Sequence, residues 1–194
     1  MMAHSFLLCV LVLLDVVAVS QAWFFFRSYP TAKAKTQVDA KCSELAVKGD
    51  CGFYSCFERR LTCGRNWYNV KYGEPYCRDF RAFQKTFSEK AQRFINDSQV
   101  CMGRELLEWY QRDSLNCHDF THEAFRAMSR CYIHSGFCDV IIKDAVNFLS
   151  IYQPQHLFQR GALKIWREIL RITYHCDPDS IKEIIQTLFE SMKD

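Results

Sequence analysis

Hydrophobic side chains recur three or four residues apart through most of the chain after residue 75, which is the spacing of one face of an α-helix. Between residues 76 and 94 this stripe predicts one long amphipathic helix or a close pair of helices. Pro75 stands where the first helical turn tolerates proline. The segments 140–152 and 162–174 show the same spacing, so both are predicted to be amphipathic helices.

The last segment, 176–194, carries the clearest helical signal. Asp177 or Asp179 can cap the first turn, and Pro178 suits an early helical position. Six apolar residues then form one continuous stripe: Ile181, Ile184, Ile185, Leu188, Phe189 and Met192. Glycine is scarce and no run of alternating residues predicts a sheet. We therefore predict an all-α fold.

The first residues indicate secretion. Residues 5–14 are apolar, but they fall short of the roughly 20 residues that a helix needs to span a bilayer, and small residues follow them. We predict a signal peptide over 1–22 with cleavage after Ala22, a flexible segment over 23–36 and a helical domain over 37–194. No later segment is apolar for long enough to cross a membrane, so we expect a secreted protein in an oxidising medium.

Ten cysteines remain once Cys9 leaves with the predicted signal, and an even number in a secreted chain favours five disulfides. The spacing C-x4-C-x6-C does not match the C-x2-4-C pairs of zinc sites, and no C-x-x-C redox motif occurs. The sequence by itself leaves the pairing open among on the order of a thousand arrangements.

Charge and motifs point away from nucleic-acid binding and from catalysis. The chain has 25 basic and 22 acidic residues, and the two kinds alternate in stretches such as "KIWREILR", so a solvated helical face is favoured over a nucleic-acid groove. It contains no G-x-S-x-G, no phosphate-binding glycine loop and no D-x-D-x-D-G calcium loop. We expect neither enzymatic activity nor a cofactor.

The motif "HDFTHE", residues 118–123, is the best candidate for a metal site. His118 and His122 would share one face of a helix, with Glu123 adjacent, so zinc binding is geometrically conceivable. A metalloprotease would need its glutamate inside the histidine pair, as in H-E-x-x-H, and this sequence lacks that arrangement. We therefore favour two exposed histidines and expect no bound metal.

Three stretches of the sequence resemble the stanniocalcin family of secreted glycoprotein hormones. These are "CGFYSCFE", "CYIHSGFC" at 131–138 and "CDPDSIKEIIQTL", and the similarity runs from about Cys42 to Met192. The resemblance implies a compact helical domain stapled by disulfides. It implies the following pairs: Cys42–Cys56, Cys51–Cys77, Cys63–Cys117, Cys101–Cys131 and Cys138–Cys176.

Two features depart from that family. Its members carry a further cysteine that links two subunits, whereas this sequence has none after Cys176, so we expect a monomer or a non-covalent homodimer. Relatives also place their glycosylation motif within the first cysteine cluster. The motif here is Asn96-Asp97-Ser98, which we place in a surface loop between two helical stretches and expect to be glycosylated. The alternative is that Asn96 and Ser98 end and cap a helix.

The resemblance implies an endocrine or paracrine regulator of calcium and phosphate balance that also inhibits pappalysin-type metalloproteinases. The expected partner is thus a cell-surface receptor or an extracellular metalloproteinase. The alternative is a secreted helical binder of calcium, lipid or host protein that keeps the scaffold without the hormone role. The residues of types enriched at binding hot spots are Trp67, Tyr68, Arg104, Trp109 and Arg112. They can equally be buried aromatic core with solvated arginines.

Overall fold

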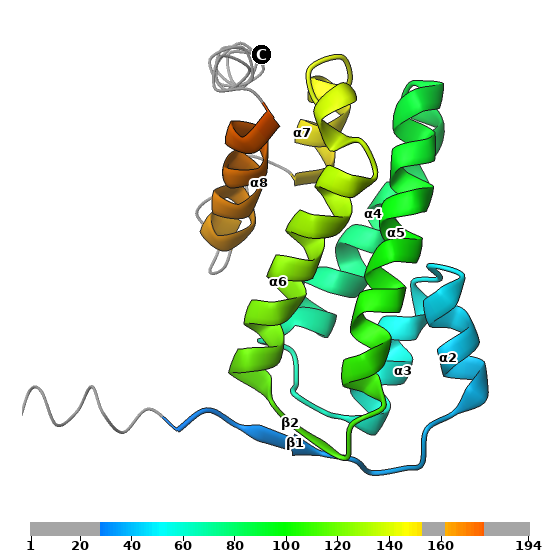
Figure 1. Ribbon diagram of the computed structural model, residues 1–194, viewed down its shortest axis with the longest axis vertical. Coiled ribbons are helices and arrows are strands. Elements are labelled where there is room, and N and C mark those ends of the chain that lie inside the picture. Colours follow the sequence, from blue (N-terminus) through cyan, green and yellow to red (C-terminus); the bar gives the residue numbers. More distant parts are fainter. Residues whose placement is uncertain (1–27, 153–161, 177–194) are drawn as a thin grey trace, which may run out of the picture. The chain divides into compact units, whose positions relative to one another are not determined.

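The computed structural model describes residues 28–152 and 162–176, and all features below belong to the unit that begins at Thr31. This unit consists of helices that pack side by side, with one short sheet (Figure 1). The predicted all-α fold is confirmed. The predicted signal peptide, the cleavage site after Ala22 and the predicted last helix lie outside the described residues.

The helices follow one another with short connections. The α-helices are α2 (Ala40–Val47), α3 (Gly52–Arg60), α4 (Glu74–Phe83), α5 (Glu89–Tyr110), α6 (Cys117–His134), α7 (Ala145–Tyr152) and α8 (Ala162–Cys176). A π-helical turn (Asn69–Gly73) precedes α4, and 3-10 turns occupy Gln84–Thr86 and Phe137–Asp139. Among these helices, none combines the length and hydropathy that crossing a bilayer requires.

The hydrophobic stripe over 76–94 is a close pair of helices, because the chain turns between α4 and α5. Ser88 is the N-cap of α5, and its Oγ accepts a hydrogen bond from the Ala91 amide. The same hydroxyl donates to the buried carboxylate of Asp144 at 2.6 Å, which ties this turn to the start of α7. Phe83 lies on the hydrophobic stripe over 76–94, but it is 48% exposed because α4 ends at that residue.

Aromatic rings fill the space between the helices. Phe57 of α3 stacks on Phe120 of α6 with ring centroids 4.7 Å apart, and Tyr110 of α5 lies 5.8 Å from Phe57. Phe148 of α7 contacts Phe94 of α5 at 5.8 Å in a second group of rings. Such tilted and stacked pairs add to the free energy of burial, so these rings fix how the helices sit on one another.

Helices α2 and α5 cross closely enough to require glycine at the crossing point. A Cβ on Gly103 would overlap the carbonyl oxygen of Ala46 and would lie 2.7 Å from that residue's carbonyl carbon. Gly49, just after α2, has a φ of +65° and lies against the backbone of Val100. Both positions therefore need a residue without a side chain.

Part of the segment predicted to be flexible is ordered. Within 23–36, the strand β1 (Thr31–Lys33) pairs antiparallel with β2 (Ser114–Asn116), and Ala32 is 5% exposed. The Lys35 amide also donates to the carbonyl of Arg60 at 2.9 Å. The flexible assignment is therefore wrong for residues 31–35. Three-residue strands are too short to produce an alternating pattern, and their pairing joins segments more than 80 residues apart.

Five disulfides connect the helices, and they are the same five pairs that the family resemblance implies. Their Cα–Cα distances lie between 5.2 and 5.7 Å, within the usual range. The bonds are Cys42–Cys56 (α2 to α3), Cys51–Cys77 (the start of α3 to α4), Cys63–Cys117 (the loop after α3 to α6), Cys101–Cys131 (α5 to α6) and Cys138–Cys176 (the last 3-10 turn to α8).

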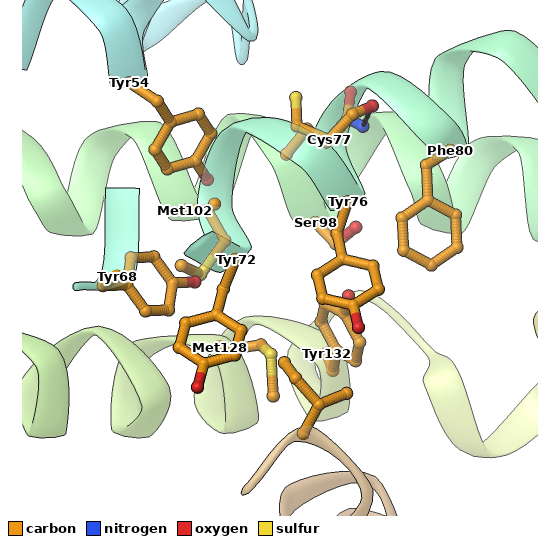
Figure 2. Close-up of a pocket in the computed structure, with 13 residues that line it drawn as sticks. Tyr54, Tyr68, Tyr72, Tyr76, Cys77, Phe80, Ser98, Met102, Met128 and Tyr132 are labelled. Carbon is orange, nitrogen blue, oxygen red and sulfur yellow. Dashed lines mark hydrogen bonds between the residues drawn. The ribbon is translucent and has the colours of Figure 1, made fainter. Parts of the chain in front are cut away.

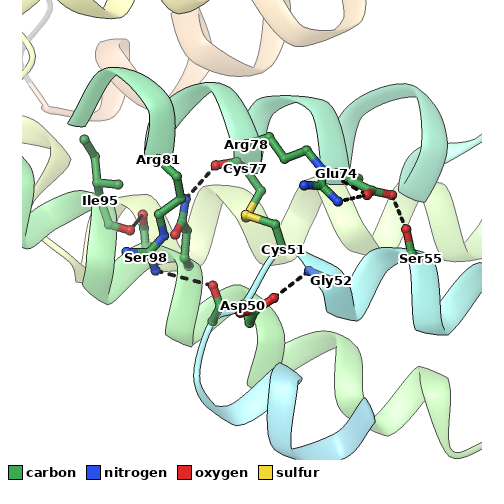
Figure 3. The surroundings of a disulfide bond; sticks show 12 residues. Asp50, Cys51, Gly52, Ser55, Glu74, Cys77, Arg78, Arg81, Ile95 and Ser98 are labelled. Carbon is green, nitrogen blue, oxygen red and sulfur yellow. Dashed lines mark hydrogen bonds and ion pairs between the residues drawn. A yellow bond between two sulfur atoms is a disulfide. The ribbon is translucent and has the colours of Figure 1, made fainter. Parts of the chain in front are cut away.

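Hydrogen bonds reinforce the disulfide between α3 and α4 (Figure 3). Glu74 of α4 accepts from the Ser55 hydroxyl of α3 at 2.6 Å and pairs with Arg78. These two partners outweigh partial burial and lower the pKa of Glu74. On the other side, Gln99 of α5 donates to the carbonyl of Cys77 at 3.2 Å. Polar contacts from α3 and α5 thus hold α4 beside the covalent bond.

We expect Gly103→Ala to lower the free energy of unfolding by about 1–3 kcal/mol, because the obstructing atoms belong to the Ala46 backbone and cannot rotate away. Chemical denaturation under non-reducing conditions measures this change. Arg104→Ala, at the exposed next position, is the control and should change stability by no more than about 0.5 kcal/mol. A Gly103→Ala protein as stable as the parent would contradict the close crossing.

Candidate binding surface

The end of α5 presents a tryptophan and an arginine together. Trp109 is half-buried, with its ring 5.8 Å from Phe120 of α6. The exposed guanidinium of Arg112 lies 3.7 Å from the centre of the indole ring and 3.7 Å from the Glu108 carboxylate. A cation held over an indole face forms a rigid amphipathic pair of the kind that protein interfaces favour.

A buried arginine positions this helix end. The side chain of Arg60 in α3 donates to the backbone carbonyls of Tyr110 and Arg112, and it lies 5.5 Å from the Tyr110 ring centre. Arg60 is 2% exposed. Its guanidinium provides hydrogen-bond partners for carbonyl groups that have none at the end of a helix. Its contact with the exposed Asp113 is long, at 3.5 Å. The Trp109–Arg112 pair is therefore held on an ordered backbone.

The other predicted anchors do not form one surface with this pair. Tyr68 is 4% exposed and packs edge-on against Phe125 at 5.2 Å, so its prediction as an exposed anchor is wrong. Trp67 is half-buried against the core. Arg104 is exposed, but it lies five residues before Trp109, which places it about 140° away around the helix.

His118 and His122 lie one turn apart on α6, with ring centroids 4.5 Å from each other. His118 contacts the carboxylate of Asp119 at 3.5 Å. Among the residues that the structure describes, no group of three or more histidine, cysteine, aspartate or glutamate side chains is arranged to hold a metal ion. The Asn116 side chain caps α6 by accepting from the amides of His118 and Asp119.

A groove that the sequence did not predict lies between α6 and α8. It is lined by His122, Phe125, Arg126, Lys164, Arg167, Glu168 and Arg171 and has a volume of about 630 Å³. The basic residues of α8 come from "KIWREILR", which sequence analysis assigned to a solvated helical face. The spacing of Lys164, Arg167 and Arg171 along one helix was the available signal. The α6 side of the groove becomes visible only in the fold.

A small pocket lies among tyrosines and methionines from several helices (Figure 2). Its volume is about 40 Å³, enough for a few water molecules at most and far below the roughly 300–1,000 Å³ of small-molecule sites. Tyr54 and Tyr68 line it, and burial raises the pKa of both hydroxyls well above the ordinary value. These tyrosines therefore stay neutral and structural.

The predicted glycosylation motif lies inside a helix, not in a loop. Asn96 is in the middle of α5, where its side-chain oxygen accepts hydrogen bonds from Arg81 at 2.6 Å and Gln84 at 3.0 Å. Ser98 is buried and bonds to the carbonyl of Ile95. The loop placement and the alternative of helix termination are both wrong, because α5 continues past this motif to Tyr110. Glycosylation of Asn96 stays a prediction of the motif alone.

Comparison with protein families identifies a match over most of the chain. The model of the stanniocalcin family matches residues 25–194, which is most of the chain. A search of the curated proteins finds no significant match.

We expect His122 to titrate below the ordinary histidine pKa of about 6.5, because partial burial disfavours its charged form and Lys164, His118 and Arg126 repel it. Lys164→Met removes one of these cations and should raise the pKa of His122. NMR titration of the imidazole signals measures both values, with His122→Gln identifying the resonance.

The matched control is Lys85→Met, which removes an exposed charge outside the groove and should leave the His122 titration unchanged. An ordinary pKa for His122, or a pKa that does not change in Lys164→Met, would contradict the clustering of positive charge at this groove.

Proposed function

Since the chain belongs to the stanniocalcin family, we propose that it is a secreted hormone that acts by binding extracellular proteins, as a regulator of calcium and phosphate balance. The family is one of secreted hormones and not of enzymes. The observation that carries the proposal is the family match over residues 25–194. Ten of the eleven cysteines, those from Cys42 to Cys176, are joined in disulfides within the chain, which fits an oxidising extracellular medium.

The proposed mode of action is inhibition of a pappalysin-type metalloproteinase. Such inhibition requires a stable surface that docks on the protease, and binding to a cell-surface receptor would make the same demand. Disulfides and packed aromatic rings supply rigidity, so little conformational entropy is lost when the protein binds. A pre-organised scaffold with a few exposed anchors therefore supports a role as a protein ligand.

We propose the Trp109–Arg112 pair as one anchor of that surface. Tryptophan and arginine are the types most enriched at binding hot spots, and Arg60 fixes the helix end that carries them. Phe120 packs against the indole ring of Trp109, so a partner protein would contact Trp109 in one orientation.

The test is cleavage of a binding-protein substrate by a purified pappalysin-type protease in the presence of the secreted protein. We expect inhibition that depends on concentration. Combined Trp109→Ala and Arg112→Ala substitutions should weaken it about 30-fold or more, since hot-spot truncations cost at least about 2 kcal/mol.

Arg104→Ala is the control, because it removes an exposed arginine from another face of the same helix. It should leave inhibition within about twofold of the parent. If the parent inhibits but the double variant and Arg104→Ala weaken inhibition equally, the Trp109–Arg112 pair is not the anchor. No inhibition, with no binding to cells, would favour the alternative of a secreted helical binding protein that keeps the scaffold without the hormone role.

A further inference from the structure

The groove between α6 and α8 is lined mainly by positively charged residues, which the proposed Trp109–Arg112 anchor does not include. Helix α8 lies beside α6 in Figure 1, and the groove between them is lined from both sides. Its charged lining residues are Arg126 from α6 and Lys164, Arg167, Glu168 and Arg171 from α8. Four basic residues against one glutamate leave a formal charge of +3, which equals the formal charge of the whole chain with histidines neutral.

Two of the four cations have acidic partners. Arg171 pairs with Glu168 at 2.7 Å and also donates to the Ser129 hydroxyl at 2.6 Å. Arg126 contacts Glu123 at 3.3 Å, but that carboxylate is shared with Arg130 at 3.0 Å. The acidic groups around the groove are therefore already engaged.

The other two cations lack such partners. Within residues 28–152 and 162–176, neither Lys164 nor Arg167 has a carboxylate within ion-pair distance. The ammonium of Lys164 lies 4.8 Å from the ring centre of Phe125, and Arg167 is exposed. Within that part of the chain, no ion pair therefore neutralises either charge.

The positive charges at the groove repel one another. Burial lowers the pKa of Lys164, and the positive charges of Arg167 and Lys71 lower it further, against the opposing effect of Glu168. Like charges crowded at one site raise the free energy of the unbound protein. A bound anion relieves that repulsion, so the groove favours negatively charged ligands.

The positions of the cations indicate an extended ligand. Lys164, Arg167 and Arg171 follow one another at intervals of three and four residues, which gives a row about 10 Å long on one face of α8. Arg126 faces this row from α6. Charges spread along a groove can contact successive anionic groups of a chain, whereas a single small anion could engage only part of the row.

We propose that this groove binds a sulfated polysaccharide, with Lys164 and Arg167 making the main contacts to its sulfate groups. Guanidinium groups bind such oxyanions through two parallel hydrogen bonds. A single-stranded nucleic acid is disfavoured, because single strands stack on several exposed aromatic rings, whereas Phe125 in this groove is 2% exposed and the only exposed ring among the described lining residues is the imidazole of His122. The proposal requires that the protein is secreted, because sulfated polysaccharides occur outside the cell. It does not depend on the hormone role.

The test measures binding of a heparin dodecasaccharide to the full-length secreted protein by calorimetry at about 150 mM salt. We expect binding that weakens as salt increases, because contacts to a polyanion release its counterions. Combined Lys164→Ala and Arg167→Ala should weaken it about tenfold or more, since two charge-assisted contacts are lost. Heparin stripped of its sulfates should not bind.

The matched control is Lys85→Ala with Arg93→Ala, which removes the same two residue types from exposed positions outside the groove. It should leave affinity within about threefold. If the groove double variant is not secreted, the single exposed Arg167→Ala should still weaken binding severalfold. Absence of binding, equal weakening by both double variants, or full displacement by millimolar inorganic sulfate would overturn the proposal.

Discussion

Covalent linkage between neighbouring helices is the constraint on which this structure depends. Several helices are only eight to ten residues long, and helices of that length are marginal in water without tertiary support. The five disulfides close loops of 14 to 54 residues, and each closure contributes about 2–4 kcal/mol by restricting the unfolded chain, although neighbouring crosslinks do not add independently. Of the α-helices described, α7 alone has no cysteine. Phe148 holds it, through contacts with Phe87, Phe94 and Phe137.

Crosslinks and ring packing together leave α6 with two different faces. Phe120 points into the core, His122 and Arg126 lie on the side that faces the groove with α8, and the buried Phe125 lies at the floor of that groove. Cys117 and Cys131 fix both ends of this helix to the loop after α3 and to α5. The charged groove is therefore built on a helix that cannot shift easily. The Trp109–Arg112 pair has a similar support, because Arg60 holds the backbone that carries it.

Helical periodicity predicted the fold class well, because each helix buries one continuous stripe. Features that depend on contacts between distant segments were not accessible in the same way. The β1–β2 pairing joins residues that are far apart in sequence, and the burial of Tyr68 depends on rings supplied by α6. Asn96 was placed in a loop because the motif lies near the end of a periodic stretch, yet α5 continues through it. The groove could not be predicted from sequence, because only the fold brings Arg126 next to α8.

Disulfide mapping of the secreted protein tests the central claim most directly, since the positions of both proposed surfaces follow from how the helices are crosslinked. Digestion without reduction, followed by mass spectrometry, identifies each linked pair of peptides. The structure predicts five bonds within one chain, Cys42–Cys56, Cys51–Cys77, Cys63–Cys117, Cys101–Cys131 and Cys138–Cys176, and no free thiol among these ten cysteines. Any other pairing, or a reactive thiol among them, would contradict this account.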